Sequence, residues 1–185
     1  MKDKPQKSNA PNKKQIIMKQ ASSGVNIDHP QIKEFEYNHI TDGIYIGTNQ
    51  CCQTHFDEKL KKEGITADIS LEEDRLDAPF GADFYVWMPV KNHAAPKPDQ
   101  LEFGVSVLEK LISAGKKVYV HCKNGHGRAP TLVAAYLVKK GKSPEEAEAL
   151  IKARRPSMHL EEVQREAIRN FSAKGGSASG GSNKA

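Results

Sequence analysis

Cysteine is scarce in this sequence of 185 residues: three are present, an odd number that does not suggest a secreted disulfide scaffold. No run approaches the roughly 18 consecutive apolar residues of a membrane-spanning helix, which argues against an integral membrane protein. Residues 1–15 are basic and polar and lack the apolar stretch of a secretory signal. We therefore expect a reducing, cytoplasmic setting.

A basic excess on the folded part of the chain is also missing. The net charge is +5, but residues 1–20 alone carry six lysines and one aspartate. Residues 21–171 carry 20 basic and 22 acidic side chains. Nucleic-acid-binding domains usually carry their basic excess on the fold itself. The charge distribution therefore argues against a nucleic-acid partner.

Composition divides the chain into three parts. Residues 1–30 mix Lys, Pro, Asn, Gln and Ser with little apolar periodicity, which predicts a disordered basic arm. Residues 173–185 form a Gly/Ser-rich run, which predicts a flexible tail. Residues 31–172 are expected to form one packed domain.

Within that domain, strand-like and helix-like segments alternate. Short β-branched or aromatic runs predict strands, and apolar residues at helical spacing predict helices. The expected strands are 44–46, 65–71, 84–88 and 118–120. The first expected helix contains Phe56 and Leu60, and two more cover 101–112 and 128–140. A fourth opens with a capping box at 143–146, and a fifth covers 161–171. This alternation predicts an α/β fold with a central, mostly parallel sheet of four to five strands flanked by helices.

The sequence HCKNGHGR, at residues 121–128, lies between an expected strand and an expected helix. Five residues separate Cys122 from Arg128, enough backbone to surround a tetrahedral anion with N–H groups. Gly125 and Gly127 permit the close backbone approach that such a loop requires, and the helix adds the positive end of its dipole. Arg128 can donate to two phosphate oxygens at once. The predicted phosphate-binding residues are Lys123, Asn124, Gly125, His126, Gly127 and Arg128.

This arrangement predicts nucleophilic chemistry at Cys122. A cysteine in such a positive environment is expected to be a thiolate. The thiolate would attack phosphorus, and water would then hydrolyse the resulting phosphocysteine. The backbone N–H groups and Arg128 would stabilise charge on the equatorial oxygens.

The loop at 121–128 resembles the signature loop of protein tyrosine phosphatases, and residues 37–171 are similar to their compact dual-specificity branch. Further matches are DGIYIG at 42–47, WMPV at 87–90 and the Arg-Pro pair at 155–156. The run GRAPT at 127–131 looks most like phosphatases of regenerating liver, and plant glucan phosphatases share its first four residues. The resemblance implies the cysteine-phosphatase fold and hydrolysis of phosphotyrosine, phosphoserine or phosphothreonine on proteins, with no cofactor. Phosphoinositides and phosphoglucans are alternative substrates, and a low-turnover module that binds phosphorylated ligands is an alternative function.

Two positions depart from the family pattern. Ala129 replaces a hydroxyl residue that is thought to help cysteine leave the intermediate, which implies a slower second step. Asn92 occupies the place of the aspartate that protonates the leaving oxygen, and a neutral amide cannot act as a general acid. Asn92 is either an engineered change that traps substrate, a position whose role passes to His93, Asp99 or Asp77, or a mark of a natural weak phosphatase that mainly binds.

Other residues allow two interpretations. Lys123 and His126 resemble the basic loop of phosphoinositide phosphatases, or they are solvated charges. Cys51 and Cys52 are free thiols, or one pairs reversibly with Cys122 as in some family members.

Two simpler expectations complete the sequence-based account. His121 is expected to be a buried histidine bonded to the loop backbone, and Arg154 and Arg155 to complement a helix dipole. Outside the signature loop no His, Cys or Asp residues have metal-ligand spacing, so no metal site is expected.

Overall fold

A five-stranded sheet with strand order β1-β2-β5-β3-β4 organises the described part of the chain. The computed structural model describes residues 35–177, which belong to the unit Ile32–Ala185. The strands are β1 (Tyr37–Thr41), β2 (Ile44–Gly47), β3 (Ile65–Ser70), β4 (Phe84–Trp87) and β5 (Lys117–His121). Only β1 runs antiparallel to its neighbour; the other pairings are parallel. The predicted mostly parallel sheet is confirmed.

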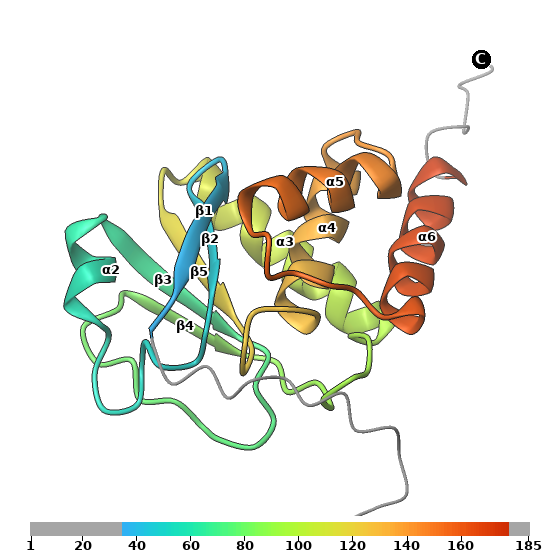
Figure 1. Cartoon of the computed structure of the whole chain (residues 1–185). Helices are drawn as coiled ribbons and strands as arrows, with labels where there is room; N and C mark the ends of the chain where they lie inside the picture. The colour runs from blue at the N-terminus through green and yellow to red at the C-terminus, as the bar shows by residue number, and fades with distance from the viewer. Residues whose placement is uncertain (1–34, 178–185) are drawn as a thin grey trace, which may run out of the picture. The chain divides into compact units, whose positions relative to one another are not determined.

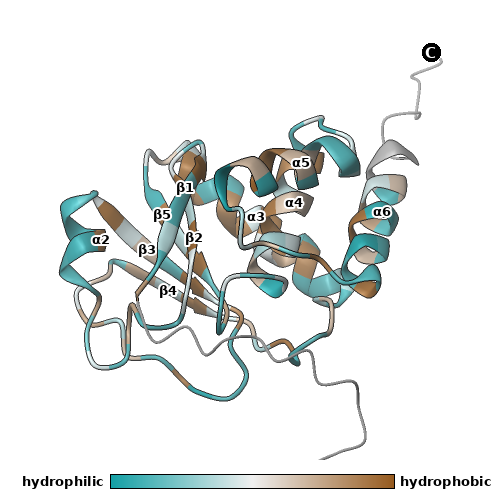
Figure 2. Cartoon of the chain, viewed as in Figure 1, coloured by the Kyte–Doolittle hydropathy of each residue, from teal (hydrophilic) through white to brown (hydrophobic). Residues whose placement is uncertain are grey.

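Helices cover both faces of this sheet. They are α2 (Glu58–Lys62), α3 (Pro98–Ser113), α4 (Arg128–Lys139), α5 (Pro144–Arg154) and α6 (Glu162–Ser177). Figure 1 shows α3, α4, α5 and α6 on one side and α2 on the other. Figure 2 shows hydrophobic residues along the strands and α4, whereas α2 is largely hydrophilic. Because helices cover both faces, the central strand β5 is apolar in three consecutive residues, 118–120, all fully buried.

Local sequence explains most boundaries of these elements. The Ser143 hydroxyl accepts a hydrogen bond from the Glu146 N–H, and the Glu146 carboxylate accepts one from the Ser143 N–H, which forms the predicted capping box of α5. Strand β1 was missed because its sequence, YNHIT, is mostly polar and lies at the sheet edge.

One predicted domain boundary, near residue 173, lies among the described residues. Helix α6 continues to Ser177, so residues 173–177 are helical rather than part of the predicted flexible tail. The basic arm at 1–30 and the rest of the tail lie outside the described residues. No helix among residues 35–177 is long and apolar enough to cross a bilayer.

Candidate active site

Cys122 follows directly after the central strand β5 and is 3% exposed. Residues 123–127 form a loop, and α4 begins at Arg128 with Gly127 as its N-cap. The strand, loop and helix therefore occur in the predicted order. The carboxyl end of a central parallel strand is where α/β folds bind ligands.

Gly125 gives the signature loop its shape. Its φ is +66°, in the left-handed region that favours glycine. A Cβ at this position would lie 2.5 Å from the Gly47 carbonyl oxygen, at the end of β2. The loop thus packs directly against backbone, and a larger residue at this position would displace it.

Arg155 holds the same loop from the other side, a role that sequence reasoning missed. The side chain is fully buried. Its Nε donates to the Gly125 carbonyl at 2.9 Å and its Nη2 to the Asn124 carbonyl at 3.0 Å. Burial lowers the pKa of Arg155, and the Glu36 carboxylate, 3.1 Å from Nη1, opposes that effect. The expected helix-dipole role is therefore wrong for Arg155, because the chain turns inward at the end of α5. The Arg-Pro match to the phosphatase family was the available signal.

Arg128 is buried and oriented by three neighbours. Its Nη1 donates to the Val90 carbonyl at 2.7 Å and to the Leu71 carbonyl at 3.3 Å. The carboxylate of Glu72, itself buried, lies 3.6 Å away. Within residues 35–177, the Arg128 side chain makes these hydrogen bonds through Nη1. Its Nε and Nη2 groups can therefore donate to a phosphate.

Asn92 lies exposed in the loop between β4 and α3. Its backbone N–H donates to the Glu73 carboxylate, and the next residue, His93, has φ +62° and pairs with the Glu161 carboxylate. The Gln164 amide donates to the Ala94 carbonyl at 3.0 Å. Contacts from two segments, at Glu73 and at the start of α6, therefore hold this loop, and Val90 at its base contacts Arg128.

The three alternative proton donors are all engaged. His93 pairs with Glu161. Asp99 lies exposed in the first turn of α3, where its carboxylate accepts a hydrogen bond from the Gln100 N–H at 2.9 Å. Asp77 is buried and accepts hydrogen bonds from Arg75, at 2.9 Å, and from the Ser70 hydroxyl, at 3.0 Å. Asp77 is therefore part of the interior rather than a solvent-facing acid.

Other loop residues have specific partners. The Lys123 ammonium lies 3.6 Å from the Asp74 carboxylate, and the His126 ring packs against His159 at a centroid distance of 5.1 Å. The hydroxyl of Thr131 donates to the Gly127 carbonyl one helical turn back, at 2.8 Å. Thr131 is thus bonded within α4 and does not replace the hydroxyl missing at position 129.

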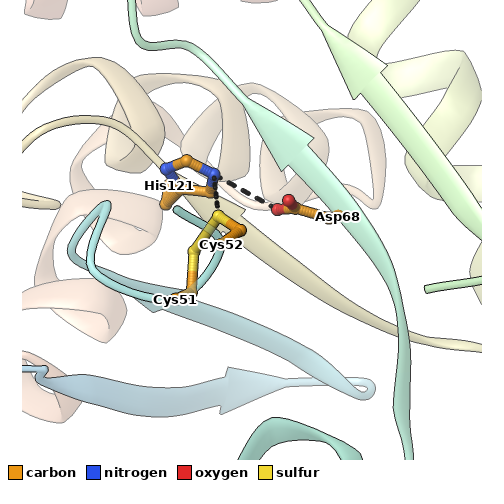
Figure 3. A group of neighbouring side chains, drawn as sticks. All are labelled: Cys51, Cys52, Asp68 and His121. Atoms are coloured by element: carbon orange, nitrogen blue, oxygen red, sulfur yellow. Dashed lines mark hydrogen bonds and ion pairs between the residues drawn. A yellow bond between two sulfur atoms is a disulfide. The ribbon is translucent and has the colours of Figure 1, made fainter. Parts of the chain in front are cut away.

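His121 is buried beside the Cys122 backbone, as expected, and it also lies in a fully buried group of side chains. Its Nε2 is 3.3 Å from the Asp68 carboxylate and 3.4 Å from Cys52 Sγ (Figure 3). The Asp77 carboxylate lies 3.6 Å from the same nitrogen. Burial alone would lower the pKa of His121, but the Asp68 and Asp77 carboxylates raise it. Burial also raises the pKa of Asp68, against the opposing effect of His121.

The three cysteines match neither interpretation from the sequence. Cys51 and Cys52 are bonded to each other, and Cys122 is a free thiol.

Comparison with known proteins agrees with this fold. The sequence matches the family model "Polymorphic toxin system, DSP-PTPase phosphatase" over residues 43–142. It is 43% identical over 77 residues to human phosphatidylglycerophosphatase and protein-tyrosine phosphatase 1, a match that covers 41% of this chain and 38% of that protein. The chain thus matches less than half the length of this relative.

Two solved structures share the fold. The crystal structure of PTPMT1 in complex with PI(5)P has a TM-score of 0.66 at 24% identity and covers 77% of this chain and 98% of that chain. The crystal structure of human DUSP28 has a TM-score of 0.70 at 19% identity, covering 76% and 99%.

These findings identify a cysteine-phosphatase fold of the tyrosine phosphatase superfamily, dual-specificity branch. Within it, the chain belongs to the DSP-PTPase phosphatase family of polymorphic toxin systems. The likeness to phosphatases of regenerating liver stays a resemblance of residues 127–131.

Proposed function

We propose that the chain hydrolyses phosphate monoesters through a phosphocysteine intermediate, without metal or organic cofactor in the reaction. The single observation that carries this proposal is the placement of the Cys122 thiol. It lies at the start of a loop shaped by Gly125, clamped by Arg155 and closed by Arg128 at the start of α4.

The reaction has two steps. Cys122 Sγ bonds to phosphorus while the bond from phosphorus to the leaving oxygen breaks. Water then attacks phosphorus, the phosphorus–sulfur bond breaks, and inorganic phosphate leaves with the thiolate restored. The N–H groups of residues 123–128 and Arg128 stabilise the oxygens in both transition states.

Asn92 makes the first step sensitive to the leaving group. An alkoxide must take a proton as it leaves, and a neutral amide does not supply one. An activated phenolate leaves without that help. Ala129 slows the second step, since no hydroxyl assists the departure of sulfur. These two residues favour a second candidate, a module that binds phosphorylated ligands and turns them over slowly.

The names of the relatives and the charge of the loop support a proposal for the substrate class. The human relative is named for phosphatidylglycerophosphate and phosphotyrosine, and the PTPMT1 structure contains PI(5)P. We propose phosphorylated proteins as substrates. Phosphoinositides are the main alternative, because the Lys123 side chain in the signature loop is half exposed. The proposed location is cytoplasmic, where the Cys122 thiol stays reduced.

Steady-state rates on an aryl phosphate and an alkyl phosphate test this function. We expect turnover of the aryl ester, much slower turnover of the alkyl ester, and no turnover by Cys122→Ser. Tight binding of a phosphopeptide with no hydrolysis of the aryl ester would instead establish the binding module. Activity in Cys122→Ser would contradict the mechanism.

A further inference from the structure

Four side chains with metal-binding atoms meet behind the signature loop. They are Cys51 and Cys52 after β2, Asp68 on β3 and His121 at the end of β5; we call them the Cys51–His121 cluster. Their ligand atoms all lie within 4.8 Å of one another, and all four residues are buried. Figure 3 shows the His121 ring facing both the Asp68 carboxylate and the bonded sulfurs of Cys51 and Cys52. Asp68 and His121 lie far from Cys51 and Cys52 in the sequence, so residue spacing could not reveal the group.

The Asp68 carboxylate has little within the cluster to compensate its charge. The residue is fully buried, and neither carboxylate oxygen has a hydrogen-bond partner among the described residues. The His121 Nε2 lies 3.3 Å from one of these oxygens. Burying a carboxylate without hydrogen-bond donors is costly, and a coordinated cation removes that cost. Asp77, by contrast, is bonded to Arg75 and Ser70 and is not a further candidate ligand.

We propose that, with the Cys51–Cys52 bond reduced, the Cys51–His121 cluster binds a divalent cation of the zinc type. The ligands are the two cysteine sulfurs, His121 Nε2 and one Asp68 oxygen. Two thiolates, an imidazole and a carboxylate form a tetrahedral donor set that suits zinc. Four protein ligands leave no open coordination position, so the site is structural and separate from the phosphatase chemistry.

Reduction comes before binding. Two electrons and two protons from a dithiol reductant break the Cys51–Cys52 bond and give two thiols, while the reductant becomes a disulfide. Each thiol releases its proton when its sulfur binds the cation. The two sulfurs then separate to roughly 3.7 Å, as two ligands of one tetrahedral zinc do. The site therefore forms only in the reduced protein.

The position of the cluster defines what the cation would do. It would join the segment after β2 to β3 and to β5, one residue before Cys122. Because the unfolded chain has no preformed site, metal binding stabilises the fold. We expect the melting temperature of the reduced protein to rise by roughly 5 °C or more at saturating zinc.

Cobalt titration of the reduced full chain, freed of metal under anaerobic conditions, tests the site. We expect about one Co²⁺ per chain, a thiolate-to-cobalt charge-transfer band and strong visible bands of tetrahedral geometry, all displaced by Zn²⁺. Single variants Cys51→Ser, Cys52→Ser and Asp68→Asn should each weaken binding at least ~10-fold. Cys122→Ser removes the third cysteine, which lies outside the cluster, and should leave binding unchanged.

Three results would overturn the proposal. They are a reduced protein that gives no charge-transfer band, bands that persist when Cys51 and Cys52 are both serine, and bands lost in Cys122→Ser. Circular dichroism of each variant separates lost ligands from lost folding. Since Cys122→Ser has no phosphatase turnover, metal binding in that variant also separates this inference from the proposed function.

Discussion

At the residue scale, Asn92 has the largest effect on the proposed chemistry. Replacing it with aspartate should supply the missing proton. We expect Asn92→Asp to raise kcat on alkyl phosphates by about 10²–10⁴-fold and to change aryl phosphates little. The rate should also gain a basic limb, because the new acid works only when protonated. Rates on both esters across pH check this.

The matched control for this change is Asn170→Asp, which adds the same charge on an exposed position of α6. This variant should leave kcat on both esters unchanged. An Asn92→Asp variant with unchanged leaving-group dependence would show that the acid position was assigned wrongly, and His93 would be tested next.

Gly125 sets the shape of the phosphate loop, and its substitution should be costly. In Gly125→Ala, the new Cβ would meet the Gly47 carbonyl at 2.5 Å in a left-handed conformation. We expect a loss of about 1–3 kcal/mol in unfolding free energy and at least ~10-fold weaker inhibition by phosphate. Gly115→Ala is the control, since its φ is +72° but nothing lies within 4 Å. Similar losses of phosphate affinity in both variants would contradict the steric argument.

Arg155 and its neighbour Arg154 form a natural comparison. Arg155 is fully buried, whereas Arg154 is exposed. A lysine at 155 keeps the charge but lacks the planar guanidinium whose Nε and Nη2 donate to the Gly125 and Asn124 carbonyls. Arg155→Lys should therefore lower the unfolding free energy by about 1–3 kcal/mol and reduce kcat/KM, while Arg154→Lys changes neither. Equal changes of unfolding free energy and of kcat/KM in the two variants would show that the hydrogen bonds of Arg155 do not support the loop.

At the scale of elements, the start of α5 offers a test of stability alone. Ser143→Ala removes the acceptor of the Glu146 N–H and half of the capping box. The expected cost is about 1 kcal/mol in chemical denaturation, with unchanged kcat/KM. A larger loss of activity than of stability would mean that α5 positions the site more directly than its capping box suggests.

The elements also show what the sequence could predict. Helical periodicity, breakers such as Gly115 and the capping box at 143–146 are local signals, so most helices and parallel strands were predictable. Strand β1 was not, because an edge strand forms through pairing with β2 rather than through its own apolar pattern.

The candidate site likewise has a part that the sequence could predict and a part that it could not. Cys122, Arg128 and the glycines lie in one continuous loop and were predictable from it. The burial of Arg155 under that loop depends on how α5 ends, and the meeting of Asp68 with His121 and Cys52 depends on the pairing of β3 with β5. Such contacts arise from tertiary structure and leave no pattern in local sequence.

At the scale of the whole molecule, both proposed sites depend on the central strand β5. One end of that strand presents His121 to the buried cluster and Cys122 to the signature loop. The strand is paired on both sides, by β2 and β3, so neither residue can shift without moving the sheet. This arrangement keeps the nucleophile fixed relative to the phosphate-binding backbone.

The most direct test of the central claim is to trap the intermediate. Rapid acid quenching during turnover of an aryl phosphate, followed by peptide mass spectrometry, locates the phosphoryl group. The account predicts one phosphoryl group on the peptide that contains Cys122, and none in Cys122→Ser. A phosphoryl group on another residue, or product formation by Cys122→Ser, would contradict it.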